Sequence, residues 1–131
     1  MKITDLKPTI VWKFFHQVTQ VPRPSKKEGK MIEFLESFAK EYKIAIKKDE
    51  AGNLLMSKPA TPGMEDRPVV VLQSHMDMVC EKNNGTKHDF DNDPIETIVD
   101  GEWLRANGTT LGADNGIGVA AELALLASDD I

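Results

Sequence analysis

The sequence predicts an α/β fold, with a mixed, mainly parallel sheet flanked by helices, from three observations. Val69 to Leu72 is a short, unbroken apolar run, which is typical of a strand covered on both faces. Thr9 to Val21 repeats apolar residues at helical spacing, and Gly116 to Ser128 is a helical segment rich in alanine and leucine. Two hairpin patterns, Ile44 to Ser57 and Ile95 to Arg105, lie on either side of the central run.

A second helix is expected directly after the first. Pro22 and Pro24 end the first helix, because proline cannot continue a helical hydrogen-bond pattern. Ser25 begins the second, and Ser25 with Glu28 has the spacing of a capping box, in which the two residues satisfy exposed backbone N–H groups reciprocally.

The hairpin patterns have turn residues at their centres. Ile44 to Lys48 alternates apolar and polar residues, and Leu54 to Ser57 returns after an Ala-Gly-Asn turn. Asp100-Gly101 separates the strands of the second hairpin, and such a pair between β-prone runs is a strong hairpin signal. We expect Trp103 to pack against the rest of the protein.

Composition narrows the class of protein and its partners. The 131 residues have the length of one domain, and a hydrophobic content of 40% with 28% charged residues is typical of a soluble globular protein. A net charge of −5 argues against nucleic acid or an anionic membrane as partner. A single cysteine excludes an internal disulfide, and neither a secretory pattern nor a membrane-spanning apolar run is seen. We expect a reducing, cytoplasmic location.

A histidine and an aspartate follow the central apolar run. His75 and Asp77 stand where the predicted strand ends, and open α/β sheets bind ligands beyond the carboxyl ends of their strands. Alternate residues of an extended segment point the same way, so both side chains would face one site while Met76 and Met78 turn toward packing. Taken alone, His-x-Asp is common by chance and favours an incidental role.

A glycine-rich stretch strengthens the functional interpretation. Gly108 to Gly118 reads GTTLGADNGIG, and glycines gather where the backbone needs unusual dihedrals or a close approach. His75 offers a zinc-binding nitrogen, and Asp77 is suited to hydrogen-bonding the other ring nitrogen. A carboxylate such as Asp114 is able to bridge two metal ions, and a two-metal site makes peptide hydrolysis by metal-activated water natural chemistry.

The two motifs, SHMDMV followed by GTTLGADNGIG, closely resemble those of the di-zinc exopeptidases of the carboxypeptidase G type, in particular the aminoacyl-histidine (Xaa-His) dipeptidases. Further segments agree, namely VPRPS, DEAGNLL, KPATPGME and DGEWLRA, so the resemblance covers essentially the whole chain. It implies a three-layer zinc-exopeptidase catalytic domain and a small peptide substrate. It also implies two divalent metal ions, with zinc expected and manganese or cobalt as alternatives.

The resemblance implies a role for each site residue. His75 would ligate one metal ion, Asp77 would be the catalytic aspartate that orients His75, and Asp114 would bridge both ions. A cis bond between Asp114 and Asn115 is also implied. Related tripeptidases usually have a second acidic residue at the position of Asn115, so Asn115 followed by Gly116 points to the dipeptidase branch.

The chain also departs from the family's pattern. It contains no Glu-Glu pair, which in the family supplies the general base and a metal ligand, and it ends at Ile131 without a lid domain. We therefore expect residues 1–131 to be the N-terminal part of the catalytic domain, with half of the metal ligands and no activity alone. Because the last helix is apolar almost all round, with Glu122 its lone charge, we also expect exposed apolar surface and self-association.

Three functions remain open from the sequence. The first is a metal-dependent dipeptidase acting on Xaa-His dipeptides. The second is an N-acyl amino acid deacylase of the same family, because the residues that choose the substrate would lie mostly outside these 131 residues. The third is a non-catalytic globular module. A Glu-Glu pair encoded downstream of Ile131 would favour an enzyme, and an early stop codon would favour the module.

Overall fold

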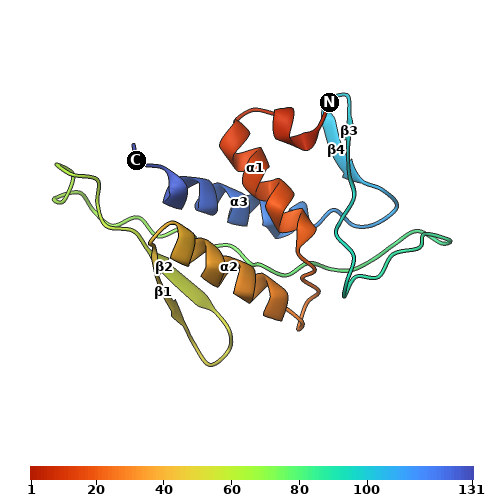
Figure 1. Ribbon diagram of the computed structural model, residues 1–131, viewed down its shortest axis with the longest axis horizontal. Helices are drawn as coiled ribbons and strands as arrows, with labels where there is room; N and C mark the ends of the chain where they lie inside the picture. The colour runs from red at the N-terminus through yellow and green to blue at the C-terminus, as the bar shows by residue number, and fades with distance from the viewer.

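A computed structural model describes residues 1–131 and shows a mixed α/β chain with two small sheets (Figure 1). The α/β class is therefore confirmed. The elements in chain order are a 3₁₀ turn Ile3–Asp5, α1 Thr9–Gln20, α2 Gly29–Glu41, β1 Ala45–Lys48, β2 Leu54–Ser57, β3 Thr97–Asp100, β4 Trp103–Ala106 and α3 Ala113–Ala127. None of the helices has the length and apolar character to cross a membrane.

The core lies where α1 and α3 pack against each other, with α2 beside them (Figure 1). The rings of Phe14 on α1 and Phe38 on α2 meet edge to face, with their centroids 5.5 Å apart. The buried apolar residues form one cluster: Ile3, Phe14, Phe15, Val18, Met31, Leu35, Phe38, Val119, Ala120, Leu123 and Ala124. The apolar character of α3 is thus explained by its burial against α1.

Both predicted hairpins are confirmed. β1 pairs with β2 in antiparallel register, Ala45 opposite Ser57, and β3 pairs with β4, Thr97 opposite Ala106. Gly101 in the second turn has a φ of +61°, a conformation that glycine adopts without a steric penalty. Trp103, which was expected to pack, is instead 78% exposed, so that prediction is wrong.

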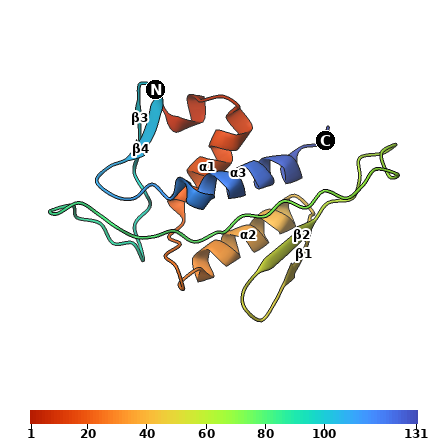
Figure 2. The ribbon, with the colours of Figure 1, turned by 180° about the vertical axis from the view of Figure 1, so that it is seen from behind.

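The predicted central strand does not form. Val69 to Leu72 lies in the long segment between β2 and β3, which crosses the back of the molecule (Figure 2), and it pairs with no other strand. Val69, Val70 and Val71 are 90%, 77% and 78% exposed. A strand of this composition requires a neighbour on each edge and a cover on each face, and residues 1–131 supply neither. The parallel sheet is therefore absent from this chain, whose sheets are both antiparallel.

The start of the second helix also differs from the prediction. α2 begins at Gly29 with Glu28 in the cap position, and no side chain caps it. The Glu28 carboxylate accepts a hydrogen bond from the backbone N–H of Lys26 at 2.6 Å, while the Ser25 hydroxyl donates to Asp77, far away in the sequence. The prediction of a capping box is wrong because the Ser25 hydroxyl bonds to the charged Asp77 side chain, and hydrogen bonds to charged groups are stronger than those to neutral ones.

Candidate metal centre

The segment that carries His75 and Asp77 is held by the connection between α1 and α2. The backbone N–H of Met78 donates to the carbonyl of Arg23 at 3.0 Å, and the N–H of Ser25 donates to the carbonyl of Met78 at 3.2 Å. Met78 is 3% exposed and Met76 packs against the core, as the alternation predicted. Burial of the two methionines turns His75 and Asp77 to the opposite side of the segment, toward solvent.

The side chains of His75 and Asp77 contact each other directly. His75 Nδ1 lies 2.8 Å from Asp77 Oδ1, and the Ser25 hydroxyl donates to Asp77 Oδ2 at 2.5 Å. The Ser25 hydrogen bond, with a further contribution from His75, lowers the pKa of Asp77 below its ordinary value. Both carboxylate oxygens of Asp77 therefore have a hydrogen-bond partner. The contact with Nδ1 fixes the orientation of the His75 ring.

Asp114 approaches His75 from the glycine-rich start of α3. Gly112 has a φ of +70°, and Asp114 and Asn115 have non-helical dihedrals, so regular helix begins only after them. The Asp114–Asn115 peptide bond is cis, as expected. The Asn115 side-chain oxygen accepts from the N–H of Gly118 at 3.2 Å, which caps the regular part of the helix.

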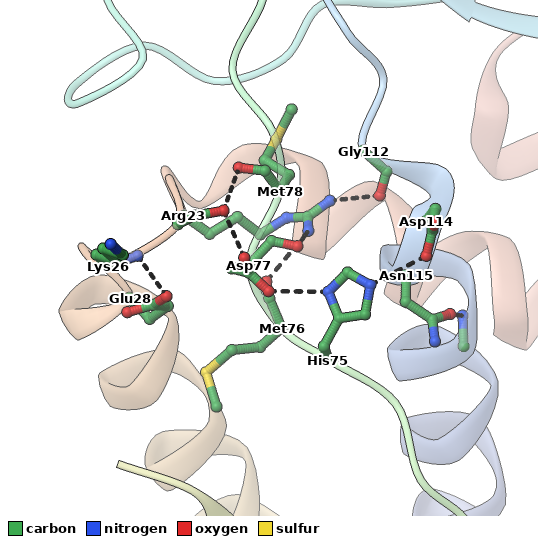
Figure 3. Close-up of polar contacts among 12 residues, drawn as sticks. Arg23, Lys26, Glu28, His75, Met76, Asp77, Met78, Gly112, Asp114 and Asn115 are labelled. Carbon is green, nitrogen blue, oxygen red and sulfur yellow. Dashed lines mark hydrogen bonds and ion pairs between the residues drawn. The ribbon is translucent and has the colours of Figure 1, made fainter. Parts of the chain in front are cut away.

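The imidazole of His75 stands between two carboxylates (Figure 3). His75 Nε2 lies 3.0 Å from Asp114 Oδ1, and this contact is the main reason that the pKa of His75 is raised, with Asp77 adding to it. The Asp114 side chain is 95% exposed. The three predicted site residues therefore come together from two segments, with the Asp114 side chain exposed and the His75 side chain half-exposed.

The donor atoms present fit one part of a metal site. An imidazole nitrogen and a carboxylate oxygen are ligands that zinc prefers, and here they converge from His75 and Asp114. Yet no group of three or more His, Cys, Asp or Glu side chains is close enough to hold an ion. That His75 and Asp114 are half of a metal site therefore stays a prediction, and an ion there would need further ligands.

Two residues of this region were missed by the sequence analysis. Ser25, which the sequence predicts as a helix cap, contacts Asp77, and Arg23, for which the sequence predicts no role, contacts the carbonyls of both motif segments. The signal that was available is the Pro-Arg-Pro-Ser pattern between the helices. Two closely spaced prolines keep the backbone extended, and an extended segment is able to pair with another, as Pro24 does with Met78.

Over nearly its whole length this chain is similar to peptidases, enzymes that hydrolyse peptide bonds. It is 48% identical over 130 residues to the cytosol non-specific dipeptidase of Escherichia coli strain K12, an alignment that covers 99% of this chain and 27% of that protein. A crystal structure of aminoacylhistidine dipeptidase from Vibrio alginolyticus superposes with a TM-score of 0.97 at 49% identity, covering 100% of this chain and 27% of that one. No protein-family model matches the chain.

A more distant structure shares the fold alone. A tripeptidase from Staphylococcus aureus superposes with a TM-score of 0.71 at 24% identity, over 89% of this chain and 31% of that one. The chain thus spans 27% of the length of the curated relative it matches. The similarity to dipeptidases applies to that share of their length.

Proposed function

We propose that these 131 residues form one part of the catalytic domain of a metal-dependent dipeptidase. The observation that carries the proposal is the convergence of His75, Asp77 and Asp114 from two distant motifs, in a chain 48% identical to part of a dipeptidase. The remaining ligands, the general base and a lid domain would be supplied by other residues of the same protein. We place the protein in the cytosol, as the name of the Escherichia coli relative suggests.

Each of the three side chains has a distinct role in this proposal. His75 would hold one divalent ion through Nε2, the nitrogen that faces Asp114. Asp114, whose side chain is 95% exposed, would help to hold that ion and a second one. Asp77 accepts a hydrogen bond from the Nδ1–H of His75, which selects the tautomer whose Nε2 carries a free lone pair for metal binding.

The chemistry is hydrolysis of the peptide bond of a short peptide. Two divalent ions, when bound, polarise the scissile carbonyl and lower the pKa of water. Zinc is the expected metal, because the donors are an imidazole and carboxylates, with manganese or cobalt as alternatives. Residues 1–131 offer no positioned base for the proton of the attacking water, so we expect them to be inactive alone.

The substrate class follows from the relatives. The Escherichia coli relative is named a non-specific dipeptidase, and the Vibrio alginolyticus relative is named an aminoacylhistidine dipeptidase. We therefore propose that the substrates are dipeptides, with Xaa-His among the preferred ones. The direct comparison is the rate on an Xaa-His dipeptide against the same dipeptide ending in alanine. Equal rates would support broad dipeptidase activity, and hydrolysis of neither would contradict the proposal.

The test of the site uses the full-length protein supplied with zinc. His75→Ala and Asp114→Ala should each abolish dipeptide hydrolysis and lower the number of zinc ions bound, measured by elemental analysis after dialysis. The matched controls are His88→Ala and Asp130→Ala, whose side chains make no contact with the site, and they should retain both properties. Unchanged zinc content in His75→Ala or Asp114→Ala would remove that residue from the proposed metal centre.

A further inference from the structure

Arg23 is a buried cation without an ion pair. Its side chain is the largest among those that are fully buried, at 1% exposure, and no carboxylate lies within ion-pair distance of it. Burying a charge in this way is costly unless hydrogen bonds compensate. All of its hydrogen bonds go to backbone carbonyls, so the residue's partners are segments of chain rather than side chains.

The guanidinium joins the two segments that carry the site residues (Figure 3). Arg23 Nη1 donates to the carbonyls of Met76 and Asp77 at 3.1 and 3.2 Å. Arg23 Nη2 donates to the carbonyl of Gly112 at 2.7 Å. The carbonyls of Met76 and Asp77 directly follow His75 in the chain, and the carbonyl of Gly112 lies two residues before Asp114. No backbone–backbone hydrogen bond joins residues 73–78 to residues 111–116. The two stretches are joined directly just beyond these residues, where the Thr110 N–H donates to the Glu81 carbonyl at 2.8 Å and the Thr110 hydroxyl donates to the Val79 carbonyl at 2.7 Å. Arg23 is therefore the residue that links the two segments beside the site itself.

Glycines make room for this guanidinium. A Cβ added at Gly112 would lie 2.5 Å from Arg23 Nη2, and one added at Gly116 would lie 2.7 Å from the same atom. Both distances are far below van der Waals contact. The glycines of the second motif therefore allow the start of α3 to approach Arg23 closely, which places Asp114 within reach of His75.

We propose that Arg23 is a positioning residue for the metal centre: its planar fork sets the separation of the two ligand-bearing segments and so holds His75 and Asp114 in register for a shared ion. This inference rests on the proposed function. An arginine suits the task because its donors project in fixed directions and reach three carbonyls at once. A lysine ammonium keeps the charge but is a compact point charge that lacks this planar fork.

The test compares Arg23→Met, Arg23→Lys and the control Arg105→Met in the full-length protein. Arg105 is an exposed arginine paired with Asp100 at a distance from the site. Affinity for Co²⁺ is measured by titration of the metal-free protein, and the visible spectrum of bound Co²⁺ reports ligand geometry. Both Arg23 variants should bind Co²⁺ about 10–100-fold more weakly, the range typical when a residue supporting a ligand is removed, with an altered spectrum.

Kinetics add a second readout. Because Arg23 does not face solvent, we expect its loss to lower kcat while KM for the dipeptide stays within about twofold, measured at saturating metal. Arg105→Met should leave Co²⁺ affinity, spectrum and kcat unchanged. Unaltered Co²⁺ affinity and spectrum in folded Arg23→Lys, with an active wild type, would overturn the inference and leave the proposed function standing.

Gly116→Ala provides an independent variant should Arg23→Met fail to fold. Gly116 has no positive φ, so the added methyl acts through its contacts with the guanidinium and with Phe15. We expect weaker Co²⁺ binding in Gly116→Ala as well. In the double variant Gly116→Ala/Arg23→Lys, the loss of Co²⁺ affinity should be smaller than the sum of the two single losses. Fully additive losses would count against a shared anchor. A wild-type protein that neither binds Co²⁺ nor cleaves dipeptides would overturn the proposed function and this inference together.

Discussion

Substituting Gly112 by alanine tests how tightly the start of α3 is built around Arg23. Gly112 has a φ of +70°, where an alanine costs about 1 kcal/mol in backbone strain. Its Cβ would also lie 2.5 Å from Arg23 Nη2 and 2.9 Å from Met78 Sδ. Both neighbours are nearly fully buried, so neither is free to move aside, and overpacking of this kind costs about 1–3 kcal/mol. We expect a total destabilisation of about 2–4 kcal/mol.

Gly101→Ala is the matched control for this substitution. Gly101 has a similar φ of +61°, but nothing lies within 4 Å of the position where its Cβ would stand. Only the strain remains, so we expect a loss of about 1 kcal/mol. Urea denaturation of wild type and both variants measures the free energies of unfolding, with an unchanged m-value required for the comparison. Equal losses for Gly112→Ala and Gly101→Ala would refute the crowding argument.

Three further predictions concern other parts of the chain. Ser25→Ala should lower the free energy of unfolding by about 1.5 kcal/mol, because the Asp77 carboxylate loses a charge-assisted hydrogen bond; no change in urea denaturation would contradict this. The 131-residue chain should self-associate through the exposed apolar residues Val69 to Leu72, and Val70→Lys should weaken the self-association. A sharp monomer peak of the wild type in size-exclusion chromatography at all concentrations would contradict this prediction. Hydrogen bonds from Asn53 hold the pKa of Asp49 below its ordinary value of 3.8. The ionised carboxylate therefore stabilises the β1–β2 turn fully above about pH 3.8. This stabilisation is lost as the pH falls through the lower pKa that Asp49 has in the folded protein. Asp49→Ala should therefore lower Tm at neutral pH, and the difference from wild type should narrow below pH 3.8 in calorimetry.

Local signals were sufficient where the structure depends on neighbours in sequence. The Asp100-Gly101 pair predicted the β3–β4 turn because glycine at positive φ is a local property. The helix predicted from Gly116 begins there in regular geometry, after two non-helical residues. The alternation around His75 likewise predicted which side chains face outward, since it depends only on an extended backbone.

Where the structure depends on distant partners, the sequence was misleading. Val69 to Leu72 has strand composition, but strand formation needs a pairing partner, and the described chain offers none. Ser25 has the spacing of a helix cap, yet its hydroxyl is bound to Asp77 from a segment that no local pattern connects to it. The Pro-Arg-Pro-Ser pattern indicates an extended segment, but it does not identify the partners of Arg23, because these are backbone carbonyls far away in the sequence.

The order in which the chain is synthesised adds a consequence of the Arg23 contacts. Arg23 leaves the ribosome long before its third acceptor, because the hydrogen bond to the Gly112 carbonyl spans 89 residues of sequence. Until that glycine emerges, the guanidinium must stay hydrated or bind only the carbonyls of Met76 and Asp77. Closure of the two segments is therefore a long-range event that follows the synthesis of Arg23 by 89 residues, and such contacts are the slow ones to form.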